Sequence, residues 1–120
     1  MITIDQIRAA ALALPEVVER ASYGGRPSWR AGPRMFVWVR EDPEALVVWV
    51  DSVEDKHALI ATSPQTFFTT SHYDGQPIVL VNLDTIDIDE ARELIIDSWR
   101  ARAPKKLVAT FDATGSGATS

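Results

Sequence analysis

The side chains best suited to acid–base chemistry lie in one short segment, where His72 precedes Tyr73. Residues 71–77 also contain glycine and proline, so we expect this segment to be a loop. An imidazole beside a phenol can donate, accept or stack near neutral pH, which makes the pair a candidate for recognition or proton transfer. The alternative is structural: the histidine bonds to nearby backbone and the tyrosine packs over the loop. Residue types alone favour this alternative.

Metal-binding patterns are absent from the sequence. His57 and His72 are the only histidines, and neither has a second ligand at the spacing of a zinc site. Asp84, Asp87 and Asp89 lack the glycine and the closing glutamate of a calcium-binding EF-hand loop, and helix capping explains them more simply. The sequence therefore predicts no metal site.

Nucleophilic and phosphate-binding motifs are equally weak. The segment Gly24-Gly25-Arg26-Pro27 lacks the spacing of a phosphate-binding loop and leads into a strand, not a helix. The chain has no cysteine, and no serine stands in a recognisable nucleophile elbow. We therefore predict no cofactor and identify no catalytic residue, so the pattern leans away from an enzyme.

Hydrophobic periodicity and turn residues predict the elements that must position these side chains. The expected helices cover residues 4–14, 53–61 and a stretch from Asp87 or Asp89 to Pro104, and the expected strands cover 27–31, 34–40, 45–50, 67–70 and 78–83. Residues 105–111 add at most a short helical turn. The order α-β-β-β-α-β-β-α predicts an α+β fold in two layers, an antiparallel sheet with helices on one face.

Length and composition indicate a single domain. With 120 residues, of which 46% are hydrophobic and 24% charged, the chain is large enough for one core. We assign residues 1–111 to the domain and residues 112–120, rich in Gly, Ser and Thr, to a flexible tail. Without a signal-like start, a membrane-length apolar run or cysteine, a cytoplasmic location and no membrane partner are expected.

Charge is distributed unevenly along a chain whose net charge is −5. This total argues against strong non-specific binding to nucleic acid, which depends on Lys and Arg neutralising phosphates. Residues 20–40, however, hold five Arg and no acid, and residues 98–111 hold four basic residues and no acid. Two cationic patches are possible, although such segregation more often serves solubility.

Two-residue turns at Gly32-Pro33 and Asp42-Pro43 would set the register of the first three strands. Trp29 then faces Phe36, which faces Trp49, and Trp38 lies on the same face. Such an aromatic row could receive a flat ligand or a partner, although rows of this kind are more often core. The opposite face, which carries Val37, Val39, Leu46 and other aliphatic residues, is the expected core face under the helices.

Several stretches together resemble one known family. They are Ala9–Val17, Arg26-Pro27-Ser28-Trp29-Arg30, Phe67–Pro77, Trp99 and Ala103–Val108, and over nearly the whole chain they resemble the MmcQ/YjbR family. The resemblance implies the two-layer fold expected above. It also implies a DNA partner, because the family is commonly labelled DNA-binding from a fold similar to a double-wing arrangement.

Carried onto this sequence, the resemblance predicts two wings at the hairpins Gly32-Pro33 and Asp42-Pro43. The residues expected to bind nucleic acid are Arg26, Arg30 and Arg34, with Lys105 and Lys106. The second wing fits poorly, because Glu41, Asp42 and Glu44 would repel DNA.

The leading hypothesis is thus a non-enzymatic DNA-binding domain. The alternative is a module that binds a small molecule or a protein through a surface made of Trp29, Phe36, Trp38, Trp49, His72 and Tyr73.

Overall fold

The computed structural model describes residues 1–41 and 43–119, so Asp42 of the predicted second turn and Ser120 of the predicted tail lie outside the described residues. The helices are α1 (Ile4–Leu12), α2 (Val53–Thr62), α3 (Ile88–Arg102) and α4 (Lys105–Thr119). The strands are β1 (Val17–Ala21), β2 (Pro27–Ala31), β3 (Arg34–Arg40), β4 (Ala45–Trp49), β5 (Phe67–Phe68) and β6 (Ile78–Val81), with short 3-10 turns η1 (Tyr23–Gly25) and η2 (Ser71–Tyr73).

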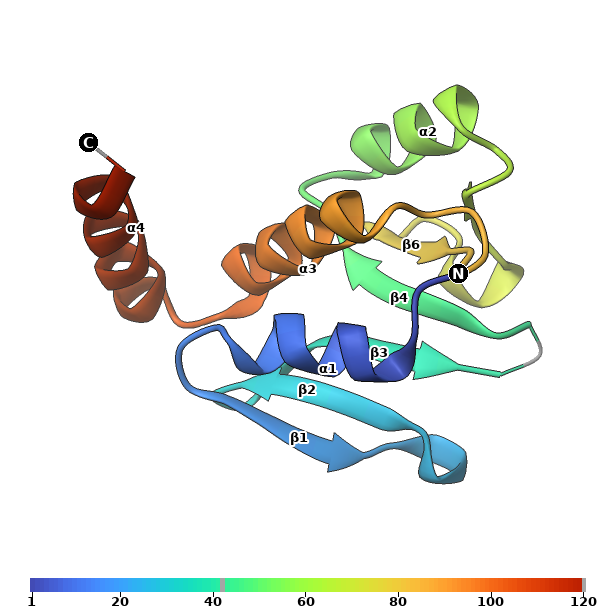
Figure 1. Cartoon of the computed structure of the whole chain (residues 1–120). Helices are drawn as coiled ribbons and strands as arrows, with labels where there is room; N and C mark the ends of the chain where they lie inside the picture. Colours follow the sequence, from blue (N-terminus) through green and yellow to red (C-terminus); the bar gives the residue numbers. More distant parts are fainter. Residues whose placement is uncertain (42, 120) are drawn as a thin grey trace.

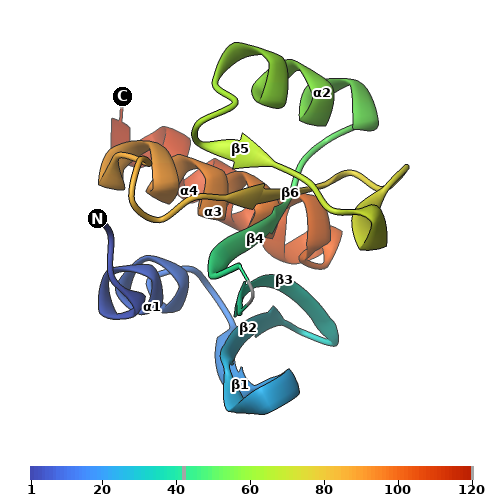
Figure 2. The same ribbon diagram turned by 90° about the vertical axis from the view of Figure 1, so that its right-hand side faces the viewer.

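The described strands form one antiparallel sheet in the order β1-β2-β3-β4-β6-β5 (Figure 1). Viewed from the side, α1 and α3 lie on one side of this sheet, while the η2 turn lies on the other (Figure 2). The α+β fold class and the two-layer arrangement predicted from the sequence are confirmed.

Side-chain caps fix where three helices begin. Thr3 and Gln6 form a reciprocal capping box at α1, Ser52 accepts from the Asp55 amide at α2, and Asp87 accepts from two amides at the start of α3. Each oxygen bonds amide groups that have no partner within the helix, so the first turn is stabilised at these positions. Of the two starts predicted for the last long helix, Asp87 and Asp89, the structure has Asp87 as the capping residue.

The main core lies between the sheet and the helices. Fully buried apolar side chains on alternate strand positions, such as Val39, Leu46, Val79 and Val81, meet Ile7 of α1 and Trp99 of α3. Period-two alternation sends these residues to one face, as expected for a sheet covered on that side. The expected core face is therefore confirmed for β3 and β4.

Strand β1 is absent from the predicted order. Its five residues include Glu19 and Arg20, and Val18 is 52% exposed, as is typical of a strand at the edge of a sheet. Such a sequence lacks the apolar alternation from which a strand is predicted. The chain turns back from α1 into β1 through Glu16, whose φ of 60° is left-handed.

Helix α4 extends beyond the short turn expected at residues 105–111. It runs to Thr119, through residues that composition assigned to a flexible tail. Phe111 anchors its described part by an edge contact with Trp99, with ring centroids 5.0 Å apart. The flexibility of residues 112–119 stays a prediction.

Candidate functional site

The sheet face opposite α1 and α3, called the open face below, carries a second, smaller apolar cluster. Val47 and Leu80 are fully buried there, Trp38 and Trp49 are half-buried around them, and Tyr73 from η2 covers part of the cluster. In the side view, the η2 turn lies on this side of the sheet (Figure 2). Half-buried tryptophans on a sheet face are candidates for ligand contact.

The predicted aromatic row is wrong in its first half. Trp29 pairs with Val37 instead of Phe36, because the β2–β3 register shifts by one residue between Trp29 and Arg30. This irregularity leaves Trp29 and Phe36 fully buried in the helix-side core. Only Trp38 and Trp49 remain on the open face, so the recognition surface predicted from the row loses two of its four members.

Strands β3 and β4 separate at the end near Trp49. There, a side chain of α3 takes the place of the hydrogen bonds between the two strands. The paired residues of the two strands run from Arg40 and Ala45 to Val37 and Val48. The Ser98 hydroxyl of α3 accepts a hydrogen bond from the Trp49 amide at 2.8 Å and donates to the Phe36 carbonyl. The serine thus satisfies two backbone groups that would otherwise be buried without partners.

One turn later on α3, Arg102 reaches this same end of the sheet. Its guanidinium carbon lies 4.1 Å from the centre of the Trp49 ring, a close cation–π contact. Burial lowers the pKa of Arg102, and the nearby charge of Arg34 lowers it further. The folded protein therefore keeps the charge of Arg102 partly removed from water and close to a second cation, and both effects cost free energy.

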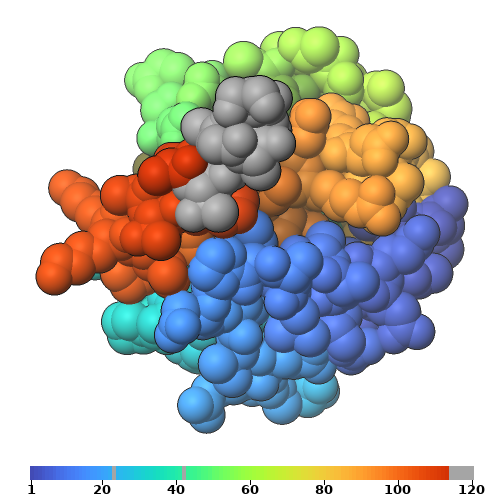
Figure 3. Space-filling view, turned by 60° about the vertical axis from the view of Figure 1, so that its left-hand side comes forward, coloured from blue at the N-terminus to red at the C-terminus, as the bar shows by residue number. Residues whose placement is uncertain are grey.

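The hairpin between β2 and β3 lies directly against the junction of α3 and α4. A Cβ added to Gly32, whose φ is +61°, would come within 3.3 Å of the Pro104 ring, so glycine permits both the turn and the close approach. Lys105 and Lys106 follow Pro104, and both are exposed. Figure 3 shows the segment around the start of α4 projecting from the body next to turquoise atoms of β3.

This packing brings together four of the five residues predicted to bind nucleic acid and adds one that was not predicted. We call this group the cationic end, and its members are Arg30, Arg34, Arg102, Lys105 and Lys106. In the described part of the chain, none of the five forms an ion pair with a carboxylate.

Several donors at the cationic end are buried without an acceptor. They are Nε of Arg30, Nε1 of Trp49 and Nε of Arg102. Buried N–H groups are nearly always bonded in proteins, and an unmade bond costs about 1–3 kcal/mol. Three such donors around one end of a sheet indicate a place where an acceptor-rich ligand would be stabilised.

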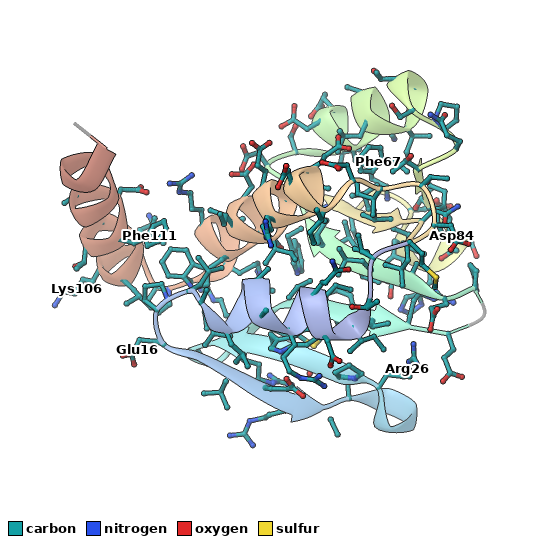
Figure 4. All side chains as sticks on the ribbon, in the orientation of Figure 1. Glu16, Arg26, Phe67, Asp84, Lys106 and Phe111 are labelled. Atoms are coloured by element: carbon teal, nitrogen blue, oxygen red, sulfur yellow. The ribbon has the colours of Figure 1, made fainter. Side chains whose placement is uncertain are left out.

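Arg26, the fifth predicted nucleic-acid contact, lies elsewhere. Its guanidinium pairs with Glu44 at 2.6 Å and with Glu41 at 3.4 Å, next to the turn between β3 and β4. Figure 4 shows Arg26 and Lys106 at opposite ends of the molecule. Glu41 and Glu44, two of the acids that were expected to repel DNA at the second turn, therefore neutralise Arg26.

The His72–Tyr73 loop is held to α2 by a buried lysine that the sequence did not single out. Lys56 is only 2% exposed, and its ammonium donates to the carbonyls of Tyr73 at 2.7 Å and Gln76 at 3.1 Å. Burial lowers the pKa of Lys56, and the charge of Asp74 partly opposes this. His72 meets Tyr73 edge to face at 4.8 Å, so the structure brings the predicted pair into contact.

Sequence reasoning missed Arg102, Ser98 and Lys56. Arg102 belongs to the basic segment 98–111 described above, but its stacking on Trp49 depends on how α3 crosses the sheet. Lys56 carries no local signal, because a lysine within a helix normally points to solvent. Among the described residues, no three His, Asp or Glu side chains gather as a metal site would require. No described helix has the length and apolar character needed to cross a membrane.

Comparisons with known proteins identify relatives of this chain. A family model described as YjbR matches residues 12–101. Uncharacterised proteins of Mycobacterium tuberculosis and Mycobacterium bovis are each 36% identical to it over 128 residues, which cover 92% of this chain and 96% of theirs.

A crystal structure of a Deinococcus radiodurans protein, DR2400, has the same fold. Its domain is described as DUF419, and it superimposes with a TM-score of 0.71 at 26% identity, over 82% of this chain and 77% of that one. The fold and the sequence comparison therefore agree.

Proposed function

This chain belongs to the YjbR family, and we propose that it is a non-enzymatic DNA-binding domain that holds DNA phosphates at the cationic end. Contacts to phosphate position DNA without reading its sequence. The proposal therefore includes little or no sequence preference.

The observation that carries the proposal is the set of cations without acidic partners at the cationic end, where Arg102 lies over the Trp49 ring. Arg102 and Arg34 repel each other, which favours any anion that lies between them. Nε of Arg30 and Nε of Arg102 are buried donors without acceptors, and phosphate oxygens are strong acceptors for arginine. Lys105 and Lys106 extend the positive charge along the start of α4.

The proposed mode uses one hairpin instead of two wings. The turn between β2 and β3 lies beside the α3–α4 junction, so both can face the same stretch of DNA backbone. The turn between β3 and β4 carries Glu41 and Glu44, which are occupied with Arg26 and do not favour phosphate. The net charge of −5 predicts that binding is weak at physiological salt and strong only at low salt.

The test is fluorescence anisotropy of labelled duplex and single-stranded DNA over a series of salt concentrations. The site variant is Arg34→Ala/Lys105→Ala, which removes two exposed cations from the cationic end. The matched control is Arg20→Ala/Arg92→Ala, which removes two exposed cations from β1 and from the first half of α3. Both variants change the net charge equally.

If all five cations meet phosphates, log K should fall with log salt at a slope of magnitude up to about 4.5 for duplex DNA. The site variant should lower this slope by about 2, while the control should leave it nearly unchanged. No binding at low salt would contradict the proposal, as would equal losses in both variants. A comparison of the two DNA forms tells whether the backbone of the duplex or of the single strand fits better.

A further inference from the structure

The outer strand β1 presents backbone groups that no strand of the described chain pairs with. It stands at one end of the strand order and pairs with β2 on one side, and it lies along the lower border of the molecule in Figure 1. An edge strand of this kind is a template for another strand. None of the five residues of the cationic end belongs to β1, so this surface is distinct from the proposed DNA contact.

The pairing of β1 with β2 shows which of its backbone groups point outward. The Ser22 amide donates to the Arg26 carbonyl at 2.6 Å, one step beyond the last pair of the β1–β2 register. Hydrogen-bonded and non-bonded pairs alternate along an antiparallel ladder, so every second residue of β1 turns its N–H and C=O away from β2. The outward groups are therefore those of Val17, Glu19 and Ala21.

The side chains of β1 leave this edge open to a partner. Charged side chains on an edge usually prevent pairing, but the Glu19 carboxylate is drawn over the helix side, where Arg8 donates to it at 2.8 Å and Trp29 at 3.0 Å. Alternation along the strand places Val18 and Arg20 on the open face. Val18 is 52% exposed, so its burial by a partner would be favourable. Arg20 is then the charge that a partner has to accommodate.

A second copy of the chain accommodates Arg20 in one register. If two β1 strands pair antiparallel through their outward groups, the two-fold axis passes through Val18, Glu19 or Arg20. An axis at Glu19 or Arg20 would place like charges directly opposite each other, which is destabilising. An axis at Val18 instead brings the two exposed valines together and sets Arg20 opposite Glu16 of the second copy. Glu16 is exposed and projects from the chain just before β1 (Figure 4).

We propose that β1 pairs with β1 of a second copy of this chain around a two-fold axis at Val18, which joins the two sheets into one. In this register, Val17 of each copy exchanges hydrogen bonds with Glu19 of the other, about four in all. Two pairs of Arg20 with Glu16, one on each side of the axis, add electrostatic complementarity. The pairing is thus specified both by an apolar contact and by opposite charges.

The arginines of β2 near this axis are far enough apart to be screened. Arg30 lies opposite Val18 in β2, so the two copies of Arg30 are separated by three strand spacings, about 14 Å. The Debye length at physiological salt is about 8 Å. The contact between two short strands is nevertheless small, so we expect a dissociation constant on the order of 100 μM. At protein concentrations on the order of 1 μM the dimer is dissociated, and DNA titrations in that range are made on the monomer.

The test follows self-association of the labelled protein without DNA, from about 10 μM to about 1 mM. Sedimentation equilibrium should give mostly monomer at the lower concentration and mostly dimer at the higher one. Amide hydrogen exchange measured by NMR then locates the interface. Exchange at Val17 and Glu19 should slow about fivefold at the higher concentration, in line with the dimerised fraction. The amides of Val18 and Arg20 already bond to β2, so their exchange should change little.

Charge variants at the paired positions test the register. Arg20→Glu should weaken the dimer about tenfold, because both pairs across the axis become repulsive. The double variant Glu16→Arg/Arg20→Glu exchanges the two charges and should restore association to within about threefold of wild type. The matched control is Arg92→Glu, which makes the same change of charge at an exposed position of α3 and should leave the dimer unchanged.

The proposal is overturned if the protein stays monomeric at about 1 mM, or if a dimer forms without slower exchange at Val17 and Glu19. It is also overturned if Arg20→Glu weakens the dimer no more than Arg92→Glu does, or if the exchanged charges fail to restore it. Preserved NMR spectra of each variant at low concentration exclude unfolding as the cause of a loss. The result does not depend on DNA binding, because no DNA is present.

Discussion

Among the described residues, arginine meets tryptophan both under α1 and at the cationic end, and only the group under α1 includes a carboxylate. Under α1, Arg8 Nε donates to Glu19 at 2.8 Å, and Trp29 Nε1 donates to the same carboxylate at 3.0 Å. At the cationic end, Arg102 stacks on Trp49 at 4.1 Å and no acid completes the group. The same residue types therefore form a closed cluster in one place and an incomplete one in the other.

The difference separates a cluster that stabilises the fold from the group of residues that we propose for binding. The hydrogen bonds from Arg8, with a smaller part from Trp29, hold the pKa of Glu19 below its usual value despite partial burial. Folding thus favours the charged form of Glu19, and the cluster stabilises the fold. At the cationic end, burial and Arg34 lower the pKa of Arg102, so folding disfavours its charge. Such a group is retained at a cost that a bound anion would offset.

The largest expected effect compares the two tryptophans. Trp29→Ala should destabilise the protein by about 3–5 kcal/mol, because a fully buried ring leaves a cavity in the main core. Trp49→Ala removes a half-buried ring and should cost no more than about half of that. Urea unfolding followed by circular dichroism measures both. Equal losses would mean that the end of the sheet near Trp49 is as much a part of the core as the closed cluster.

The next effect concerns the serine beneath Trp49. Ser98→Ala should cost about 1–3 kcal/mol, because it leaves the Trp49 amide and the Phe36 carbonyl buried without partners. The exposed Ser71→Ala serves as the control and should change the free energy of unfolding by less than about 0.5 kcal/mol. A loss for Ser98→Ala no larger than the control would show that water reaches these backbone groups once the hydroxyl is removed.

Local sequence signals predicted the elements well and the sheet surfaces only in part. The start of α3 at Asp87 was among the two predicted positions, because capping depends on neighbours within a few residues. The register of β3 and β4 was also correct, since the pairs sum to the predicted value from Val37 and Val48 onward. A turn of fixed length determines that register.

The candidate site was predicted less well because it depends on long-range packing. A one-residue irregularity between β2 and β3 moved Trp29 into the core, and no local pattern marks such a shift. The contact of Arg102 with Trp49 joins residues 53 positions apart and follows from how α3 crosses the sheet. The basic composition of residues 98–111 indicated that this segment is cationic. Only the structure shows that Trp49 lies beside it.

The pH dependence of the closed cluster gives a third test. Glu19→Gln should destabilise the protein by about 1–2 kcal/mol at neutral pH, because Arg8 and Trp29 lose a charged acceptor. The pKa of Glu19 is lowered on folding, so its contribution is present above the ordinary value of 4.5 and is lost as the pH falls through the lowered value. Wild type and variant should therefore become similar in acid. A difference in their free energies of unfolding that stays constant down to about pH 3 would contradict a role for the charge.

The smallest expected change in stability is at Arg102, and it tests the comparison most directly. Arg102→Met keeps much of the apolar contact with Trp49 and removes the charge. The loss of a cation–π contact worth about 0.5–1 kcal/mol is opposed by relief of the burial that lowers the pKa of Arg102, so stability should stay within about 1 kcal/mol of wild type. DNA affinity at low salt should nevertheless fall severalfold, because one phosphate contact disappears. If Arg102→Met instead destabilises the fold as much as Glu19→Gln and leaves DNA affinity unchanged, the arginine is a structural element like Arg8. The missing carboxylate would then have no functional meaning.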